Sequence, residues 1–103
     1  MQVFDVDALR PPLRVRPLRE GDRVAIGGGG MKKVVDLMAE RGIPRSLRGG
    51  QPVIEDSSGI LWAPGIRRAD RAMVGTGTDR IWVVRWIGKL PVDAALMGGE
   101  TRR

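Results

Sequence analysis

The chain has 103 residues, of which 42% are hydrophobic and 29% are charged, and its net charge is +6. This length accommodates one domain with a modest core, and the apolar fraction argues against a disordered chain. Histidine and cysteine are absent, which excludes disulfides, thiolate chemistry, imidazole metal sites and a serine–histidine–aspartate triad. No apolar run approaches the roughly 18 residues of a membrane span, and the first residues lack a signal-peptide pattern. We therefore expect a cytoplasmic domain whose positive charge favours a polyanionic partner.

Two short strands are predicted before the first turn of the chain. Apolar and acidic residues alternate over 3–7, which is typical of a strand, and the prolines at 11 and 12 then break the chain. In the segment "LRVRPL", Leu13 and Val15 would lie on one face of a strand and Arg14 and Arg16 on the other. The turn "REGDR" and a brief apolar segment follow, and they lead into four consecutive glycines.

A helix is predicted over about residues 31–41. Met31, Val34, Val35 and Met38 repeat with the three- and four-residue spacing of one helix face, and Gly42 supplies a left-handed stop. A short second helical turn is expected over about residues 44–48, because a proline opens it and two glycines follow it.

The second half of the chain predicts strands. Residues 53–62 are interpreted as a hairpin with its turn at 56–59, residues 71–74 as a brief strand and residues 75–79 as a turn. The clearest strand is "RIWVVRWIG", with Trp82, Val84 and Trp86 on one face and Ile81, Val83 and Arg85 on the other. We therefore predict an α+β fold: a small single domain (1–87) of five or six short strands in mixed or antiparallel sheets with one main helix, followed by a weakly ordered tail at 88–103.

The glycine-rich stretch "IGGGGMKK" raises the hypothesis of a nucleotide site. A Walker loop fails, because Met31 occupies the place of its second glycine and Lys33 the place of its serine or threonine. A dinucleotide fingerprint fails as well, since the chain lacks a parallel βαβ unit. Lys32 and Lys33 in the first turn of a helix could still hold an anion against its backbone N–H groups. The alternative is a solvated loop followed by a helix with lysines on its polar face.

The remaining cations fall into clusters that could form one phosphate-tracking surface or separate solvated faces. Trp62, Trp82 and Trp86 could stack on unpaired bases, but core positions are favoured in a chain with three Trp and one Phe. The carboxylates show no metal-loop spacing, and Asp22 is interpreted as a turn residue or an ion-pair partner. The basic clusters are Arg14, Arg16, Arg19 and Arg23; Arg45 and Arg48; and Arg67, Arg68 and Arg71.

The order of these motifs resembles the C-terminal domain of bacterial tRNA(Ile)-lysidine synthetase over about residues 13–86. The resemblance is carried by "LRVRPLREGDR", the glycine loop, the two lysines before a helix, "IPR", "PVI", "GILWAPGIRR" and the last strand. Family positions carried over are Arg14, Arg16, Gly21, Asp22, Arg23, Lys32, Lys33, Pro44, Arg45, Gly65 and Arg67. The chain departs from the family at "VAI", where an aromatic residue and a proline are usual, and at "RRADRA", where an acidic–aromatic pair is common.

The resemblance implies a tRNA-contacting module with a fold similar to a domain of the phenylalanyl-tRNA synthetase β subunit. The family's enzyme is a ligase that uses ATP and lysine to convert the wobble cytidine of an isoleucine tRNA into lysidine. Its ATP and magnesium belong to an N-terminal PP-loop domain with an S-G-G-x-D-S signature, which this sequence does not contain. We therefore expect no cofactor and no catalysis in this chain alone, which is consistent with either an excised domain or a short gene.

The leading hypothesis is a noncatalytic tRNA-binding domain, with tRNA(Ile) and the catalytic domain of the same enzyme as expected partners and homodimerisation left open. The alternative is a structural domain that packs on a catalytic or partner subunit without RNA contact. An independent phosphate-dependent enzyme is disfavoured, because no acid/base pair is available. The candidate RNA-binding residues are Arg14, Arg16, Arg23, Lys32, Lys33, Arg45, Arg48 and Arg67. Gly21, Asp22, Gly27, Gly30 and Gly65 are the expected structural turn residues.

Overall fold

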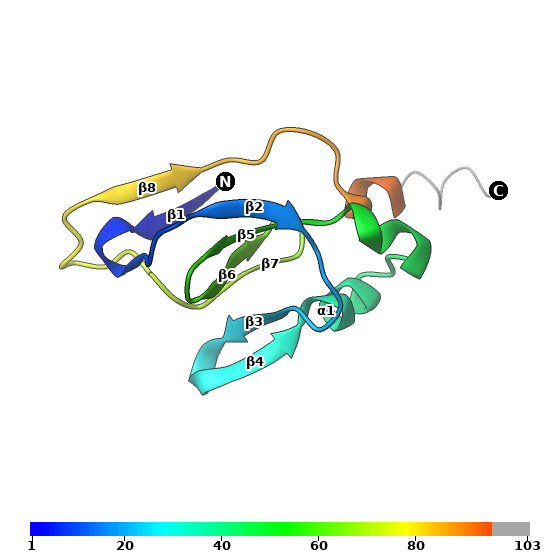
Figure 1. The fold of residues 1–103 in the computed structure, drawn as a ribbon, viewed down its shortest axis with the longest axis horizontal. Coiled ribbons are helices and arrows are strands. Elements are labelled where there is room, and N and C mark those ends of the chain that lie inside the picture. Colours follow the sequence, from blue (N-terminus) through cyan, green and yellow to red (C-terminus); the bar gives the residue numbers. More distant parts are fainter. Residues whose placement is uncertain (96–103) are drawn as a thin grey trace.

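The computed structural model describes residues 1–95, which form short antiparallel strands joined by turns (Figure 1). Short 3-10 segments occur at Val6–Ala8, Gly27–Gly29 and Arg45–Gly50, and residues 91–95 form a further short helix. The main helix, α1, spans Val34–Glu40. The strands are β1 (Gln2–Asp5), β2 (Arg14–Pro17), β3 (Arg23–Ile26), β4 (Gly30–Lys33), β5 (Pro52–Asp56), β6 (Gly59–Ala63), β7 (Arg67–Arg68) and β8 (Ile81–Val84).

A central sheet with the order β2-β5-β6-β7 lies between two ribbons, β1-β8 on one side and β3-β4 on the other (Figure 1). The two sides follow from the alternation of side chains along β5, because successive residues of a strand point to opposite faces. Val53 packs in a cluster with residues of β3 and α1, whereas Ile54 packs in a second cluster with Phe4 of β1. The central hairpin β5-β6 is therefore buried on both faces.

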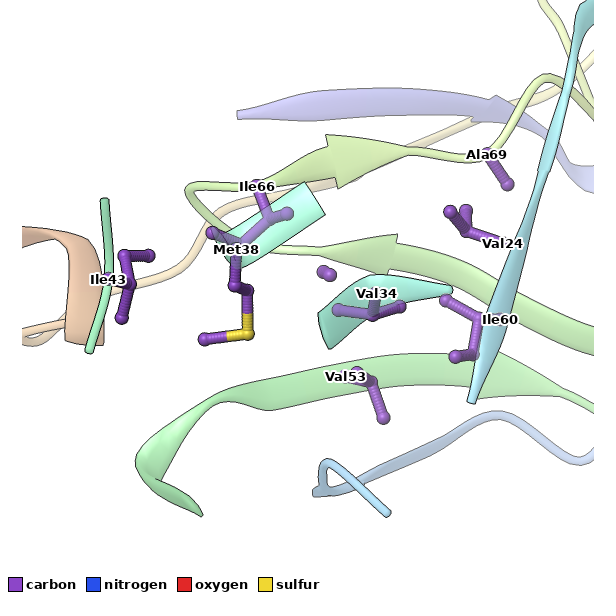
Figure 2. Packing of buried hydrophobic residues seen from close by; sticks show 9 residues of the cluster. Val24, Val34, Met38, Ile43, Val53, Ile60, Ile66 and Ala69 are labelled. Atoms are coloured by element: carbon purple, nitrogen blue, oxygen red, sulfur yellow. The ribbon is translucent and has the colours of Figure 1, made fainter. Parts of the chain in front are cut away.

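The larger core fills the space between the central sheet, β3 and α1 (Figure 2). Val34 and Met38 are four residues apart on α1 and are both fully buried, which is the spacing of one helix face. They meet Val24 of β3 and Val53 of β5. Ile43, which follows the helix, closes the end of the same cluster.

The smaller core lies under the ribbon formed by β1 and β8. Phe4 is fully buried and its ring centroid lies 5.7 Å from that of Trp82, with the rings tilted by 35°. Trp62, with 5% of its surface exposed, belongs to the same cluster, and Trp86 packs against it. All three tryptophans therefore pack in or against the smaller core, as the low aromatic content of the sequence predicts.

The predicted helix over 31–41 begins three residues too early. Met31–Lys33 belong instead to β4, which pairs with β3 so that Arg23 lies opposite Lys33 and Val24 opposite Lys32. The glycines form the tight connection of this hairpin, where Gly28 (φ +80°) and Gly29 (φ +81°) adopt the left-handed conformation. Met31 fits the helical spacing only by coincidence, because its backbone is paired with Ala25 in the β3-β4 hairpin. Lys32 and Lys33 therefore do not lie in the first turn of a helix.

The structure confirms some of the other predicted elements and corrects the rest. The strands near residues 3–6 and 13–18, the hairpin at 53–62, the 44–48 helical turn and the α+β class are confirmed. Within residues 1–95 there are eight strands rather than five or six, all paired antiparallel, and residues 71–74 form no strand. Where a weakly ordered tail is predicted from residue 88, residues 91–95 are helical and Val92 and Ala95 pack against the larger core. The rest of that prediction, 96–103, lies outside the described residues.

No helix in the described part of the chain is long and apolar enough to cross a membrane.

Candidate nucleic-acid interface

The turn between β2 and β3 is held in place by an arginine and an aspartate. The Arg16 guanidinium donates to both carboxylate oxygens of Asp22 at 2.9 and 3.0 Å, and its Nε donates to Glu55 at 3.0 Å. The Asp22 carboxylate also accepts from the backbone N–H of Arg19 at 2.6 Å, and Gly21 takes a φ of +87°. Asp22 is thus both a turn residue and an ion-pair partner. The paired Arg16 positions the turn that carries Arg19 and Arg23.

The pairing between Arg16 and Asp22 strengthens both charges. The hydrogen bonds that Arg16 donates to Asp22 are the main reason that its pKa is raised, with Glu55 adding to the effect and burial opposing it. Burial favours a higher pKa for the Asp22 carboxyl, but hydrogen bonds from Arg16 and from the Arg19 backbone lower it below its usual value. Both groups are therefore charged at neutral pH, and the Arg16 guanidinium, only 12% exposed, has little donor capacity left for a ligand.

Three segments that are distant in the sequence enclose a basic groove of about 460 Å³ beside this turn. They are the β2–β3 turn, the junction of β4 with α1, and the 3-10 segment that starts at Arg45. One carboxylate, that of Glu20, stands against four cations in the lining. Arg48 donates from Nε to the Ile43 carbonyl at 3.1 Å, which orients its guanidinium. The groove is lined by Leu18, Arg19, Glu20, Lys33, Val35, Arg45, Arg48 and Gly49.

A pair of like charges borders the groove on the β3-β4 ribbon. Arg23 and Lys33 occupy directly opposite positions of the two strands, and both are exposed. Neither makes a side-chain hydrogen bond or ion pair with any residue between 1 and 95. Like charges facing each other across an antiparallel pair are destabilising, so this arrangement leaves unbalanced positive charge at the edge of the groove. An anion bound there would relieve it.

The structure brings only part of the predicted basic surface together. Lys32 points to the other face of β4 and pairs with Glu40 at 2.6 Å, and Arg67 pairs with Asp70 at 2.9 Å. Arg14 lines a different groove, next to Glu55 and Asp56. Lys33, Arg45 and Arg48 share one site with Arg23 at its border, whereas Lys32, Arg67 and Arg14 lie outside it.

Arg19 is the cation of the groove that is not among the candidate residues from the sequence. In the sequence Arg19 is only one member of a basic cluster. Its charge does not distinguish it from its neighbours Arg14, Arg16 and Arg23. The signal that distinguishes it is its place inside the "REGDR" turn, which the Arg16–Asp22 pair folds toward the groove.

Two further arginines are structural. The buried Asp56 carboxylate accepts from the Arg71 guanidinium at 2.7 Å and from the backbone N–H groups of Arg10 and Ser58, each at 2.9 Å. Burial favours a higher pKa for Asp56, but these hydrogen bonds, with Arg71 foremost, lower it. Arg68 stacks 4.3 Å from the Phe4 ring centroid and donates to the Val3 carbonyl at 2.7 Å; burial lowers its pKa.

The glycines that are expected in turns occupy two kinds of position. Gly21 and Gly65 have positive φ values of +87° and +79°. At Gly65 an added Cβ would lie only 2.9 Å from the Leu90 side chain, so this position also needs a small residue for packing. Gly27 lies in the hairpin connection and Gly30 is the first residue of β4, but the left-handed residues are the two glycines between them.

The arrangement of strands and helix has counterparts among solved structures. A crystal structure of the TilS C-terminal domain superposes with a TM-score of 0.66 at 39% sequence identity, covering 77% of this chain and 63% of that one. An N-terminal fragment of the phenylalanyl-tRNA synthetase β subunit from Pyrococcus horikoshii superposes with a TM-score of 0.63 at 21% identity, covering 78% of this chain and 26% of that one. The second match shows the fold alone. The fold is therefore that of the TilS C-terminal class of small α+β domains.

Sequence comparison defines the family. The model of the TilS substrate C-terminal domain matches residues 13–94. A tRNA(Ile)-lysidine synthase of Geobacillus kaustophilus is 44% identical over 69 residues, which is 65% of this chain and 15% of the relative. That of Geobacter sulfurreducens is 34% identical over 87 residues, or 84% of this chain and 18% of the relative. The chain belongs to the family of C-terminal domains of tRNA(Ile)-lysidine synthase, and it spans less than a fifth of the length of these two relatives.

Proposed function

We propose that this chain is a noncatalytic tRNA-binding domain that serves a tRNA(Ile)-lysidine synthase. The observation that carries the proposal is that Arg23 and Lys33, which have no ion-pair partner among residues 1–95, lie opposite each other at the border of a groove. Arg19, Arg45 and Arg48 line the same groove. Cations without carboxylate partners are available to phosphates, and several within one groove can follow a nucleic-acid backbone. The similarity to tRNA(Ile)-lysidine synthases supports tRNA(Ile) as the polyanion.

On this proposal the domain contributes affinity and position rather than chemistry. Phosphate contacts fix the register and orientation of a nucleic acid without reading its bases. ATP, magnesium and the free lysine that becomes part of lysidine would bind to the catalytic PP-loop domain of the longer enzyme. The groove would hold the tRNA backbone while the wobble cytidine is modified there, in the cytoplasm.

The test is a titration of the 103-residue chain with a tRNA(Ile) transcript over a series of salt concentrations. Log K should fall linearly with log salt, by roughly 0.7–0.9 for each neutralised phosphate. The double variant Lys33→Ala/Arg45→Ala should reduce the slope by that amount for each lost contact. A flat salt response, or no binding at low salt, would favour a domain that packs on a catalytic or partner subunit without RNA contact.

A matched control removes two cations outside the groove. Lys32→Ala/Arg67→Ala changes the net charge equally, but these side chains are paired with Glu40 and Asp70. We expect this variant to keep most of the salt slope. Equal losses in both double variants would mean that binding depends on net charge and not on the groove.

A further inference from the structure

The outer edge of β8 is an unpaired strand edge in the described part of the chain. β8 pairs with β1 on its other side only, and β1 is covered on its own outer edge: Asp5 donates its N–H to the Ala72 carbonyl and the Val3 carbonyl accepts from Arg68. Exposed edges are usually protected by charged residues, prolines or bulges. β2 carries Arg14 and Pro17, but Ile81–Val84 has no such residue.

The hydrogen bonds of the β1-β8 ribbon determine which residues of β8 present their backbone outward. The N–H of Asp5 and the carbonyl of Val3 point away from β8, so Ile81 and Val83, their opposite partners, turn their backbone groups to the open edge. The Arg80 carbonyl accepts from the Val6 N–H at 3.0 Å. The even-numbered residues of β8 and its flank therefore direct their backbone groups toward β1. A strand that adds to this edge must therefore hydrogen bond with Ile81 and Val83.

We propose that this edge pairs with the same edge of a second copy of the chain, in an antiparallel β8-β8 arrangement centred on Trp82. This register places Ile81 opposite Val83 of the second copy, and both are hydrogen-bonding positions of the open edge. Registers displaced by one residue fail, because they would oppose Ile81 to a residue whose backbone already faces β1. A contact of this kind is self-complementary and closes at two copies.

Charge selects this register over the others that the backbone permits. Asp79 and Arg85 lie two residues outside Ile81 and Val83, so in the centred register Asp79 of one copy faces Arg85 of the other at both ends. Displacement by two positions along the partner would leave each of these charges opposite an uncharged residue. Opposite charges facing each other across strands are stabilising, and like charges are destabilising. Asp79 and Arg85 are both exposed, and Asp79 has no hydrogen-bonding partner among residues 1–95.

The apolar face of β8 gives the contact its packing. Ile81 and Val83 are 52% and 55% exposed, and Val3, opposite Val83 on β1, is 39% exposed. In the paired arrangement Ile81 of one copy lies beside Val83 of the other, so aliphatic side chains that are isolated in the single chain become cross-strand neighbours. The β1-β8 ribbon lies on the opposite side of the central sheet from the β3-β4 ribbon (Figure 1), so pairing through β8 leaves the basic groove open.

Sedimentation equilibrium of the 103-residue chain between about 10 μM and about 1 mM tests the proposal, a range that detects dissociation constants weaker than micromolar. We expect a monomer–dimer equilibrium in the unmodified chain. Asp79→Arg and Arg85→Asp each place like charges opposite one another at both ends, and each should weaken the dimer by about tenfold or more. Mixing the two variants should restore association, because a mixed pair has opposite charges at both ends.

The controls reverse charges outside the register. Asp36→Arg lies on α1 and Lys89→Asp lies beyond the strand, and both residues are exposed; neither should change the dissociation constant. A chain that stays monomeric up to about 1 mM overturns the proposal, as does a dimer that responds equally to test and control variants. If mixing the two variants fails to restore association, the dimer forms through another face and the proposal is also overturned. None of these outcomes bears on the salt-dependent binding of tRNA by Lys33 and Arg45.

Discussion

Two regions of this domain are rich in arginine, but their arginines differ in whether other residues bind their guanidinium groups. Around Asp56 and Phe4, Arg71 pairs through Nη2 with a buried carboxylate, and Arg68 is held by backbone carbonyls and an aromatic ring. In the basic groove, Arg19 and Arg45 have no side-chain hydrogen-bond or ion-pair partner anywhere in residues 1–95. The first region is part of the fold, whereas the second is available to a ligand.

In a basic domain, the presence or absence of bonding partners distinguishes structural arginines from those that are available to a ligand, whereas charge does not. A guanidinium offers five donors in a rigid fork, so it can bridge several carbonyls and a carboxylate as readily as it binds phosphate. Arg16 illustrates an intermediate case, since its guanidinium is occupied by two carboxylates and holds the turn that precedes Arg23. Substitutions in the two regions should therefore act on different measurements.

The largest effect is expected from Asp56→Ala. It would leave the Arg71 guanidinium and the backbone N–H groups of Arg10, Ser58 and Gly59 without their shared acceptor. Breaking a buried ion pair on one side costs about 3–5 kcal/mol, which is a large part of the stability of a domain of this size. Urea unfolding measures the loss. Asp36→Asn, at an exposed carboxylate in the first turn of α1, should change the free energy of unfolding by no more than about 1 kcal/mol, and equal losses in both would refute the structural role of Asp56.

Arg16→Ala should be next, and it should affect both regions. The side chain is 12% exposed and makes hydrogen bonds with two carboxylates that are themselves partly exposed, so we expect their joint loss to cost about 1.5–3 kcal/mol. The substitution also frees the turn at Asp22, so tRNA affinity should fall together with stability. Arg45→Ala is the matched contrast: it should lower affinity and leave the urea midpoint unchanged. An Arg16 variant with normal stability and a reduced salt slope would instead place Arg16 in direct contact with RNA.

Acid should weaken the structural region gradually without any substitution. The pKa values of Asp22 and Asp56 are lowered in the folded chain, so their contribution to stability is fully present above their unfolded pKa of about 3.9. It is lost as the pH falls through the lower folded values. The urea midpoint should thus be level between about pH 5 and 7 and decline below about pH 4. Asp22→Asn should flatten the decline; a midpoint that holds steady to pH 2 would contradict the pairing.

The fold was largely predictable from sequence, because it depends on local patterns. Alternation identified the strands near residues 3–6 and 81–84, and turn residues identified the 53–62 hairpin. The β3-β4 hairpin was not predictable in this way: Met31 matches the helix spacing, and only pairing with β3 draws Met31–Lys33 into a strand. The short helix at 91–95 depends on contacts with the larger core, which no local pattern contains.

The sequence predicts that the candidate site is basic, but it does not predict which of the cations line the groove. Every cation of the groove belongs either to one of the arginine clusters or to the pair of adjacent lysines in the sequence. Which of them are paired depends on residues far along the chain, such as Glu55 for Arg16. The partner of Lys32, Glu40, is near in sequence, but it is reached only because β4 precedes α1. Charge spacing alone therefore overestimated the continuous surface.

The smallest effect, and the sharpest contrast, concerns the two adjacent lysines. Lys33→Gln removes a like-charge contact with Arg23 and a cation at the start of α1, and relief of each is worth a few tenths of a kcal/mol to about 1 kcal/mol. Lys32→Gln removes an exposed ion pair with Glu40, which contributes about 0–1 kcal/mol. The free energy of unfolding should therefore rise in the first variant and stay level or fall in the second.

The two lysine variants should diverge in the opposite sense when tRNA affinity is measured. Lys33→Gln should bind more weakly with a smaller salt slope, whereas Lys32→Gln should bind almost as the unmodified chain does. A residue whose removal stabilises the free domain but weakens its complex is placed for the ligand and not for the fold. If Lys33→Gln instead destabilised the chain and left binding intact, the basic groove would belong with the structural arginines.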